Sequence, residues 1–396
     1  MAEWALYLFA CCVLVITLPG TLELALLTFG GFLPRRPRSV TAAGRLQDVR
    51  VALIIPAYNE ELLIARTINS LLACANPVPA ADIVVVACNC TDKTVEIAHS
   101  LGCATIERTD PKRPGKGYGL DRAFRLLETA GYDAYVIVDA DSVVSPNFID
   151  EFRKAFAGGA LAAQCVLRAA DHSANTRTAL MHIALLAFTF LRPLAQSRLG
   201  VSVGIFGNGF ALRSQTVKAV PYTCYSIAED LEYHTKLIRS GVRIEFVEDA
   251  SVFCEVCTDG RQAKVQRERW EGGRFRVMLE QAPGLAREII SKRRVQLIEP
   301  LCELLLLPLA YHSLLLGTLL LVGFGPFGIY ALIGLLLVIA HVSQAMVLGK
   351  ATAHDWKALL TVPIFIGWKL LNVLGIIKAA RKTTTGKRTE RRASEI

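Results

Sequence analysis

The sequence predicts an α/β domain built on a mostly parallel sheet and flanked by apolar segments that can cross a membrane. Two observations predict this arrangement. Between residues 45 and 272, short apolar runs alternate with stretches of helical spacing, which is typical of a parallel sheet covered by helices. The chain of 396 residues is also 53% hydrophobic, with a mean hydropathy of +0.39 and a net charge of +9. That hydropathy is too high for a purely soluble protein.

Residues 1–33 form the first apolar segment. Within it, Ala5–Phe32 has one charged side chain, Glu23, and the basic stretch PRRPR follows at 34–38. A cleaved signal peptide carries its basic residues before the apolar core, so an uncleaved transmembrane anchor is expected. The positive-inside rule then places the end of this anchor, and the domain that follows it, in the cytoplasm.

Further apolar segments lie near the C-terminus. Residues 298–349 contain two runs, Leu301–Phe324 and Phe327–Leu348, and each is long enough to cross a bilayer. The apolar stretch at 356–378 is followed by a basic tail at 379–396. A third crossing here would carry that tail out of the cytoplasm, against the positive-inside rule. An interfacial or re-entrant helix is therefore expected at 356–378.

Four predicted strands each end in polar residues. The strands are Val51–Ile55, 82–89, 104–110 and 135–141. The carboxyl ends of parallel strands form one edge of a sheet, where ligands bind. The residues expected at that edge mix carboxylates with cations and comprise Tyr58, Asn59, Glu60, Asp92, Lys112, Arg113, Lys116, Asp139 and Asp141. Such a mixture suits a nucleoside diphosphate held with a divalent metal.

Asp139 and Asp141 follow the fourth strand, two residues apart. Carboxylates this close repel each other unless a cation lies between them. Mg2+ and Mn2+ prefer carboxylate oxygens and take further ligands from water and phosphate, so these residues are expected to bind such an ion. No His/Cys metal site is expected elsewhere, because the eleven cysteines form no disulfide or zinc framework. The CxxC pair Cys254 and Cys257 is interpreted as reduced and structural.

Two common nucleotide-binding motifs are absent from the sequence. The first strand is followed by PAYNEE (56–61) rather than by the GxGxxG of a dinucleotide-binding fold, and the loop PGKGYG (114–119) lacks the spacing of a P-loop. That loop could be an ordinary flexible surface loop. Since it places Lys116 between glycines at the edge of the sheet, we expect it to reach a phosphate.

Seven motifs follow one another in the order found in family 2 glycosyltransferases. They are PAYNEE (56–61), TDKT (91–94), GKGYGL (115–120), DAD (139–141), GNG (207–209), AED (228–230) and QRERW (266–270). In this ordered set the chain resembles the membrane-embedded members with the Rossmann-like GT-A fold, which include cellulose, hyaluronan and poly-N-acetylglucosamine synthases. The resemblance implies a GT-A domain at 45–272. The arginine-rich stretch 273–297 after it is expected at the membrane surface.

The resemblance also implies a role for each motif. Asp139 and Asp141 would bind the metal and the diphosphate of a nucleotide-sugar, and Asp230 would be the general base. The donor site would further include Pro56, Tyr58, Glu60, Asp92 and Lys116, and the acceptor and diphosphate site would include Gly207, Asn208, Gly209, Glu229, Gln266, Arg269 and Trp270. Carboxylates at the start of a helix also serve as caps, so the choice of Asp230 rests on the resemblance.

Two single residues stand apart from these motifs. Cys88 occupies the position where the family often has an aspartate that helps to hold the base of the nucleotide. A thiol cannot accept the same charge-assisted hydrogen bonds, so a different nucleotide preference is expected. His234 lies at helical spacing on an apolar face and is interpreted as a packing residue.

The expected function is that of an inverting, metal-dependent hexosyltransferase in the cytoplasmic membrane. It would move a sugar from a UDP-sugar to a growing polysaccharide at the cytoplasmic face, using Mg2+ or Mn2+. Its partners would be the donor, the acceptor, membrane lipids and an optional export protein, and no nucleic acid is expected. Two alternatives stay open: a single transfer to a lipid-linked acceptor, and a non-catalytic membrane partner, for which Cys88 is the argument.

Overall fold

The computed structural model describes residues 2–36, 49–256, 260–323, 325–364 and 367. Its centre is an eight-stranded sheet with the strand order β3-β2-β1-β4-β7-β6-β8-β5. The strands are β1 (Val51–Ala57), β2 (Ile83–Cys88), β3 (Ala104–Arg108), β4 (Ala134–Ile137), β5 (Ser142–Val144), β6 (Ala162–Ala169), β7 (Phe210–Arg213) and β8 (Ile244–Cys254).

The first four strands form the parallel half of the sheet. Strand β1 pairs in parallel with β2 on one side and with β4 on the other, and β2 pairs in parallel with β3. These are the four strands that the apolar runs predict. The register sets Ala57 opposite Ala87 and Cys88 opposite Arg108, so the carboxyl ends of β1, β2 and β3 lie at one edge. The predicted parallel sheet is confirmed here.

The second half of the sheet is mixed. Strand β7 is antiparallel to both β4 and β6, β5 is antiparallel to β8, and β6 and β8 run in parallel with a bulge between Cys165 and Val166. The whole sheet is therefore mostly parallel with antiparallel insertions. The short β7 delivers the segment before it to the end of β4, next to Asp139.

Helices cover both faces of the sheet. They are α2 (Ile64–Leu72), α3 (Thr94–Ser100), α4 (Lys116–Leu127), α5 (Phe148–Ala157), α8 (Ser214–Ala219) and α9 (Glu229–Arg239), with a 3-10 turn η2 at Ala80–Asp82. Alternate residues of each strand point to opposite faces. One face packs on α2, α3 and α5, and the other packs on α4 and α9, so that two apolar cores form.

An apolar helical segment after β6 was not predicted from the sequence. It consists of α6 (Thr176–Leu185), the π-helical turn η3 (Leu186–Leu191) and α7 (Arg192–Leu199). The segment Thr176–Leu199 is long and apolar enough to cross a membrane, but 72% of its most apolar window is buried inside the protein. Its hydrophobicity is therefore used mainly for packing against the rest of the chain.

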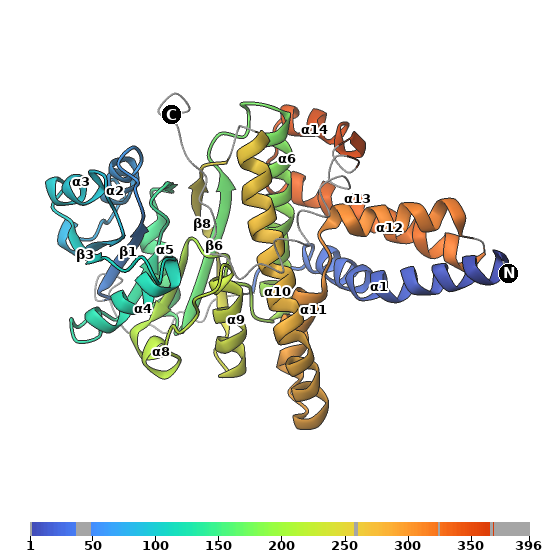
Figure 1. Cartoon of the computed structure of the whole chain (residues 1–396), viewed down its shortest axis with the longest axis horizontal. Coiled ribbons are helices and arrows are strands. Elements are labelled where there is room, and N and C mark those ends of the chain that lie inside the picture. The colour runs from blue at the N-terminus through green and yellow to red at the C-terminus, as the bar shows by residue number, and fades with distance from the viewer. Residues whose placement is uncertain (1, 37–48, 257–259, 324, 365–366, 368–396) are drawn as a thin grey trace.

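Helix α10 (Gly260–Lys292) joins the QRERW motif to the arginine-rich stretch. The sequence analysis set a boundary at residues 272 and 273, between the domain and a separate surface segment. A single helix of 33 residues runs through that position. In Figure 1 this helix runs upright between the sheet and the apolar helices.

Three apolar helices extend together from the α/β part in Figure 1: α1 (Ala2–Gly30), α12 (Leu309–Val322) and α13 (Pro326–Leu348). They pack through a small core of Ala10, Val13, Leu319, Phe327 and Ala331. Among the described residues, three helices are long and apolar enough to cross a membrane, namely Glu3–Gly30, Thr176–Leu199 and Pro326–Leu348. A fourth is added if the bent pair Val295–Leu305 and Leu309–Val322 counts as one span.

The expected span Leu301–Phe324 is bent in the structure. Helix α11 (Ile298–Leu305) and α12 meet at an angle of 76°. The break contains Pro308, which has no backbone N–H and disfavours helical geometry at the residue before it. Residue 324 lies outside the described part of the chain.

The chain then continues into the short helix α14 (Ala353–Leu359). The helix expected at 356–378 lies mostly outside the described residues, as does the basic tail at 379–396. The ten cysteines in the described part are all free, which agrees with the predicted absence of a disulfide framework there; Cys257 is not among them.

A buried ionic network joins the apolar helices to the α/β part. Arg192 of α7 is 2% exposed and pairs with Glu23 of α1 at 2.6 Å and with Glu303 of α11 at 3.8 Å. On α9, His234 Nδ1 lies 3.3 Å from Glu303 Oε2. The imidazole is buried, as predicted for a packing residue, but it faces two carboxylates, since Glu299 lies 3.9 Å from its other nitrogen.

Replacing Arg192 with methionine is expected to destabilise the protein, because Glu23 and Glu303 would remain buried without their cation. Breaking a buried ion pair costs about 3–5 kcal/mol, which corresponds to a fall of roughly 10 °C in the unfolding temperature of detergent-purified protein. Arg125→Met is the matched control, because Arg125 is exposed and pairs with Asp121 within one helix. Equal losses in the two variants would contradict a structural role for the network.

Candidate active site

Lys116 and Asp139 meet at the carboxyl end of the parallel strands. Asp139 follows β4, and Lys116 is the first residue of α4. The Lys116 ammonium donates hydrogen bonds to Asp139 Oδ1 and to the carbonyl oxygen of Gly207. Burial alone lowers the pKa of Lys116, but the charges of Asp139, Glu229 and Asp230 outweigh that effect and raise it. The lysine is therefore a fixed cation that donates to two acceptors and lies near the carboxyl groups of Glu229 and Asp230.

The GNG turn before β7 has a backbone conformation and close contacts that require glycine at two positions. Gly207 and Gly209 have φ values of +77° and +64°, which favour glycine. A Cβ atom on Gly209 would lie 2.4 Å from Cys165 Sγ, and one on Gly207 would lie 3.0 Å from Asp230 Oδ2. The Asn208 side chain accepts a hydrogen bond from the backbone N–H of Asp139 at 3.0 Å. The turn therefore links the DAD motif to Asp230.

Two buried polar residues support this turn and were missed by the sequence analysis. Gln164 of β6 donates to the carbonyl oxygens of Asn208 and Gly209 at 2.9 and 3.1 Å, and it accepts from the N–H of Phe206. Ser142 accepts from the Asn208 amide at 2.9 Å and donates to Asp141 at 3.2 Å. A glutamine in the middle of an apolar strand was the available signal for the first of them.

Two glycines of GKGYGL allow close packing of α4. Gly117 and Gly119 lie inside α4. A Cβ atom on Gly117 would lie 2.0 Å from the carbonyl oxygen of Cys224, and one on Gly119 would lie 2.7 Å from Cys88 Sγ. The thiol of Cys88 is buried in the core under α4, and burial raises its pKa. Lys116 of this motif points into the site described above.

The AED motif supplies two acidic residues at the first turn of α9. Burial and the adjacent charge of Asp230 raise the pKa of Glu229 to about 8. Burial also raises the pKa of Asp230 to about 6, although the N–H of Leu231, 2.8 Å from its carboxylate, and the charge of Lys116 oppose this rise. An acid with a pKa near 6 is ionised at neutral pH and can still accept a proton, as a general base requires.

The QRERW motif lies on the first half of α10. Gln266 and Arg269 are half-buried, and Trp270 is 47% exposed. Burial and Asp141 raise the pKa of Asp139, and the charge of Arg269 opposes that rise, so Arg269 lies near the DAD motif. A Cβ atom on Gly273 would lie 2.6 Å from Ile227, just before α9. Helix α10 therefore packs directly on the segment that carries the AED motif.

The predicted donor residues on the first two loops take part in a separate set of contacts. Asn59, with φ +52°, accepts from the N–H of Thr91 at 2.8 Å. Asp92 accepts from the hydroxyl and N–H of Thr94 and from the N–H of Glu61. Asp92 thus ties the two loops together. Glu60 is buried here as well, whereas Tyr58 is exposed and Pro56 of β1 is half-buried.

The residues of the DAD motif fit a divalent metal. Asp139 and Asp141 offer carboxylate oxygens, which are the ligands that Mg2+ and Mn2+ prefer. Burial and repulsion from Asp141 raise the pKa of Asp139, and only Lys116 and Arg269 oppose the rise. A divalent cation between the carboxylates of Asp139 and Asp141 would relieve the repulsion between them. Cys254 lies near these carboxylates, since burial and then the charges of Asp141 and Asp139 raise its pKa. The sequence analysis did not place this cysteine at the site.

Comparison with known proteins identifies the α/β part. A model of the family described as glycosyltransferase like family 2 matches residues 49–273, which is more than half of the chain. The glycosyltransferase AglD of Haloferax volcanii is 35% identical over 124 residues, which cover 30% of this chain and 19% of that protein. The probable glycosyltransferase YdaM of Bacillus subtilis is 23% identical over 238 residues, which cover 58% and 56%. The chain therefore spans at most about half the length of these two relatives.

A solved structure shares the fold over nearly the whole chain. The mannosyltransferase PcManGT from Pyrobaculum calidifontis, in complex with GDP-Man and Mn2+, superposes with a TM-score of 0.56 and 18% identity. The match covers 90% of this chain and 98% of that chain. The mixed, mostly parallel sheet is consistent with the predicted Rossmann-like GT-A fold.

Glu229 is expected to make stability depend on pH. Below pH 4.5 the carboxyl is protonated in both states; as pH rises, the unfolded chain ionises freely while the folded chain retains the proton until about pH 8. Stability is therefore lost between these values. Glu229→Gln lacks this loss. The difference in unfolding temperature between the variant and the wild type should therefore be larger at pH 8 than at pH 5, by on the order of 5 °C in favour of the variant. Glu128→Gln, on the surface, controls for the removal of one carboxylate.

Proposed function

The chain belongs to glycosyltransferase family 2, and on this premise we propose that it transfers a sugar from a nucleotide-sugar to an acceptor hydroxyl with inversion at the anomeric carbon. The observation that carries the proposal is the meeting of Lys116, Asp139, Gly207 and Asp230, which come from four separate segments of the fold. A cation and a base thus lie beside a carboxylate pair that suits a divalent metal.

The residues of the chain have distinct tasks in this reaction. Asp230 takes the proton of the acceptor hydroxyl as the oxygen attacks the anomeric carbon. The bond from that carbon to the diphosphate breaks on the opposite face, and its electron pair leaves with the diphosphate. Lys116 and Arg269 stabilise the growing negative charge. A divalent ion held by Asp139 and Asp141 would neutralise charge on the same diphosphate when bound.

Trp270 is proposed to bind the sugar of the acceptor. Its side chain is 47% exposed on α10, and the same helix presents Arg269 to the DAD motif. An exposed indole offers a flat apolar face on which a sugar ring can stack. Gln266, one turn before it, would contribute a polar contact in the same region.

We also propose that the reaction takes place at a membrane surface, with α1, α12 and α13 in the bilayer. The basic residues after α1 support this orientation of the catalytic part. Arg35 pairs with Glu248 and Asp249 at 2.6 Å each, and Arg36 donates to the carbonyl oxygens of Arg198 and Leu199. They hold the end of α1 against the α/β part, so both belong on the side that the positive-inside rule assigns to the cytoplasm.

Of the two acceptors, packing of the apolar helices favours a lipid-linked one. The interior between α1, α12 and α13 is filled by Ala10, Val13, Leu319, Phe327 and Ala331. A filled bundle provides no path for a polysaccharide, whereas a lipid-linked acceptor needs only the membrane surface beside the site. Extension of a polysaccharide, with an export path completed by another protein, is the second candidate. The donor would be a UDP-sugar or GDP-mannose, and PcManGT binds the latter.

Asp230→Asn is expected to lose transfer by a factor of order 10² or more, because the acceptor hydroxyl loses its base. Donor binding, measured by calorimetry with UDP-glucose, UDP-N-acetylglucosamine and GDP-mannose, should persist in the variant. In the wild type, the transfer rate should fall as pH drops below about 6, where Asp230 takes up a proton. Near-normal turnover in Asp230→Asn would remove this residue as the base.

The two acceptors predict different products. With labelled donor, a divalent ion and native membrane lipids, a single transfer gives one labelled glycolipid that partitions into organic solvent. Extension gives a ladder of water-soluble products that grows with time. Asp139→Ala combined with Asp141→Ala is the inactive control. A ladder made by the purified chain alone would overturn the preference for a lipid-linked acceptor.

A further inference from the structure

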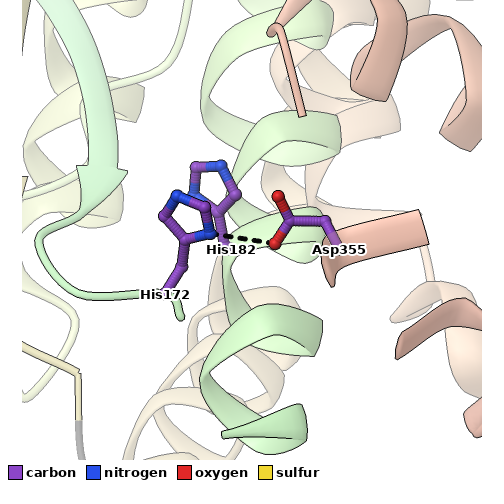
Figure 2. Close-up of side chains that lie close together, drawn as sticks. All are labelled: His172, His182 and Asp355. Carbon is purple, nitrogen blue, oxygen red and sulfur yellow. Dashed lines mark hydrogen bonds and ion pairs between the residues drawn. The ribbon is translucent and has the colours of Figure 1, made fainter. Parts of the chain in front are cut away.

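Two histidines and an aspartate from distant parts of the chain meet away from the active site. His172 lies in the loop between β6 and α6, His182 lies on α6, and Asp355 lies on α14. Their ligand atoms all lie within 4.8 Å of one another. Figure 2 shows the two imidazole rings side by side, with the Asp355 carboxylate next to them. The sequence analysis expected no His/Cys metal site, and it missed this cluster, whose members His172 and Asp355 are 183 residues apart.

This cluster is largely buried, and one of its polar atoms has no hydrogen-bond partner. Asp355 is fully buried and His182 is 4% exposed. One carboxylate oxygen of Asp355 lies 2.9 Å from His172 Nδ1, and the other accepts two hydrogen bonds from Thr352 at 2.8 Å. Nδ1 of His182 has no hydrogen-bond partner. A buried polar nitrogen without a partner is disfavoured, so a ligand for it would add stability.

The donor set indicates which ligand it would be. Neutral imidazole nitrogens together with one carboxylate suit Zn2+ and related first-row ions, whereas Mg2+ takes an all-oxygen set. The rings of His172 and His182 stack with centroids 4.0 Å apart, an arrangement that two charged imidazolium rings would not adopt. The nearby Arg168 does not occupy the carboxylate, since its guanidinium donates to the carbonyl oxygen of Gly349 at 3.1 Å.

We propose that His172, His182 and Asp355 bind one Zn2+-type ion, which fastens α14 to the loop after β6. The proton on His172 Nδ1 moves to Nε2 through solvent, since this side chain is partly exposed, so Nδ1 becomes a ligand and no net proton is released. An ion must lie in the plane of each ligating ring, so the stacked rings rotate apart on binding. Water completes the coordination. The site is structural and independent of the proposed transfer reaction.

The three residues of the proposed metal site connect the end of the apolar helices to the α/β part. Helix α14 directly follows α13, one of the three apolar helices. The existing contacts of Asp355 with Thr352 are local to α14. Among the residues that the structure describes, His172 is the partner that connects this carboxylate to the α/β part, and His182 lies beside it. An ion shared by the three residues would tie the end of α13 to the sheet that carries the active site.

Metal uptake by the full-length, detergent-purified chain without a histidine tag tests the proposal. The background is Asp139→Ala with Asp141→Ala, which removes the other metal-binding motif. After chelator treatment and gel filtration with Zn2+, elemental analysis should find one ion per chain. Co2+ in its place should show the visible absorption of a cobalt ion with protein ligands. Absence of both signals would overturn the proposal regardless of any further variant.

Further variants identify the ligands. His182→Asn and His172→Gln should each weaken Zn2+ binding by about 100-fold or more, since even the loss of an outer-shell partner costs 10–100-fold. His99→Asn is the matched control, because His99 lies outside the cluster beside Thr105, and it should bind as the background does. His172 is partly exposed and lies in a loop, so this variant is expected to fold. Unchanged affinity in both ligand variants would show that the ion binds elsewhere.

Discussion

The interaction on which the candidate active site depends is the half-buried contact of Lys116 with Asp139. Glu229 and Asp230 lie close enough to alter the charge of the same ammonium, and the site holds more carboxylates than cations. Burial raises the pKa of Glu229 and Asp230, and the neighbouring carboxylates add to this rise. It also makes the site receptive to a divalent ion and unfavourable for a bare diphosphate. Because Lys116 is anchored by the carbonyl oxygen of Gly207 as well, the ammonium keeps its position whichever partner the carboxylates take.

Helix α9 links this site to the apolar helices. Asp230 and His234 are four residues apart and so lie on one face of the helix. The first turn faces Lys116, and the next turn faces the network of Arg192 and Glu303. A shift of α11 or α1 would therefore move charges that bear directly on α9. The catalytic part and the apolar bundle are joined by buried ion pairs, which require a defined geometry, as well as by apolar packing.

Local sequence patterns predicted the features that depend on neighbouring residues. The apolar runs located β1 to β4, and the polar residues after them located Asp139 and Lys116 at one edge. The patterns failed where the signal is ambiguous or not local. The three-residue β5 is too short to be recognised, and Thr176–Leu199 looks like a membrane span because a protein core and a bilayer both select apolar residues. Pairings such as Arg192 with Glu23 join residues 169 apart, which no local pattern records.

The same ambiguity bears on how the apolar helices are understood. The most apolar window of Thr176–Leu199 is 72% buried, whereas those of α1 and α13 are 28% and 33% buried. The exposed apolar surface of these two adjacent helices, each long enough to cross a bilayer, supports their proposed place in a membrane. Helix α12 completes this group only after the bend at Pro308, so α11, which carries Glu303, stays with the α/β part while α12 leaves it. The bend thus marks where the chain passes from the ionic network to the apolar bundle, and it explains why one apolar run in the sequence serves two environments.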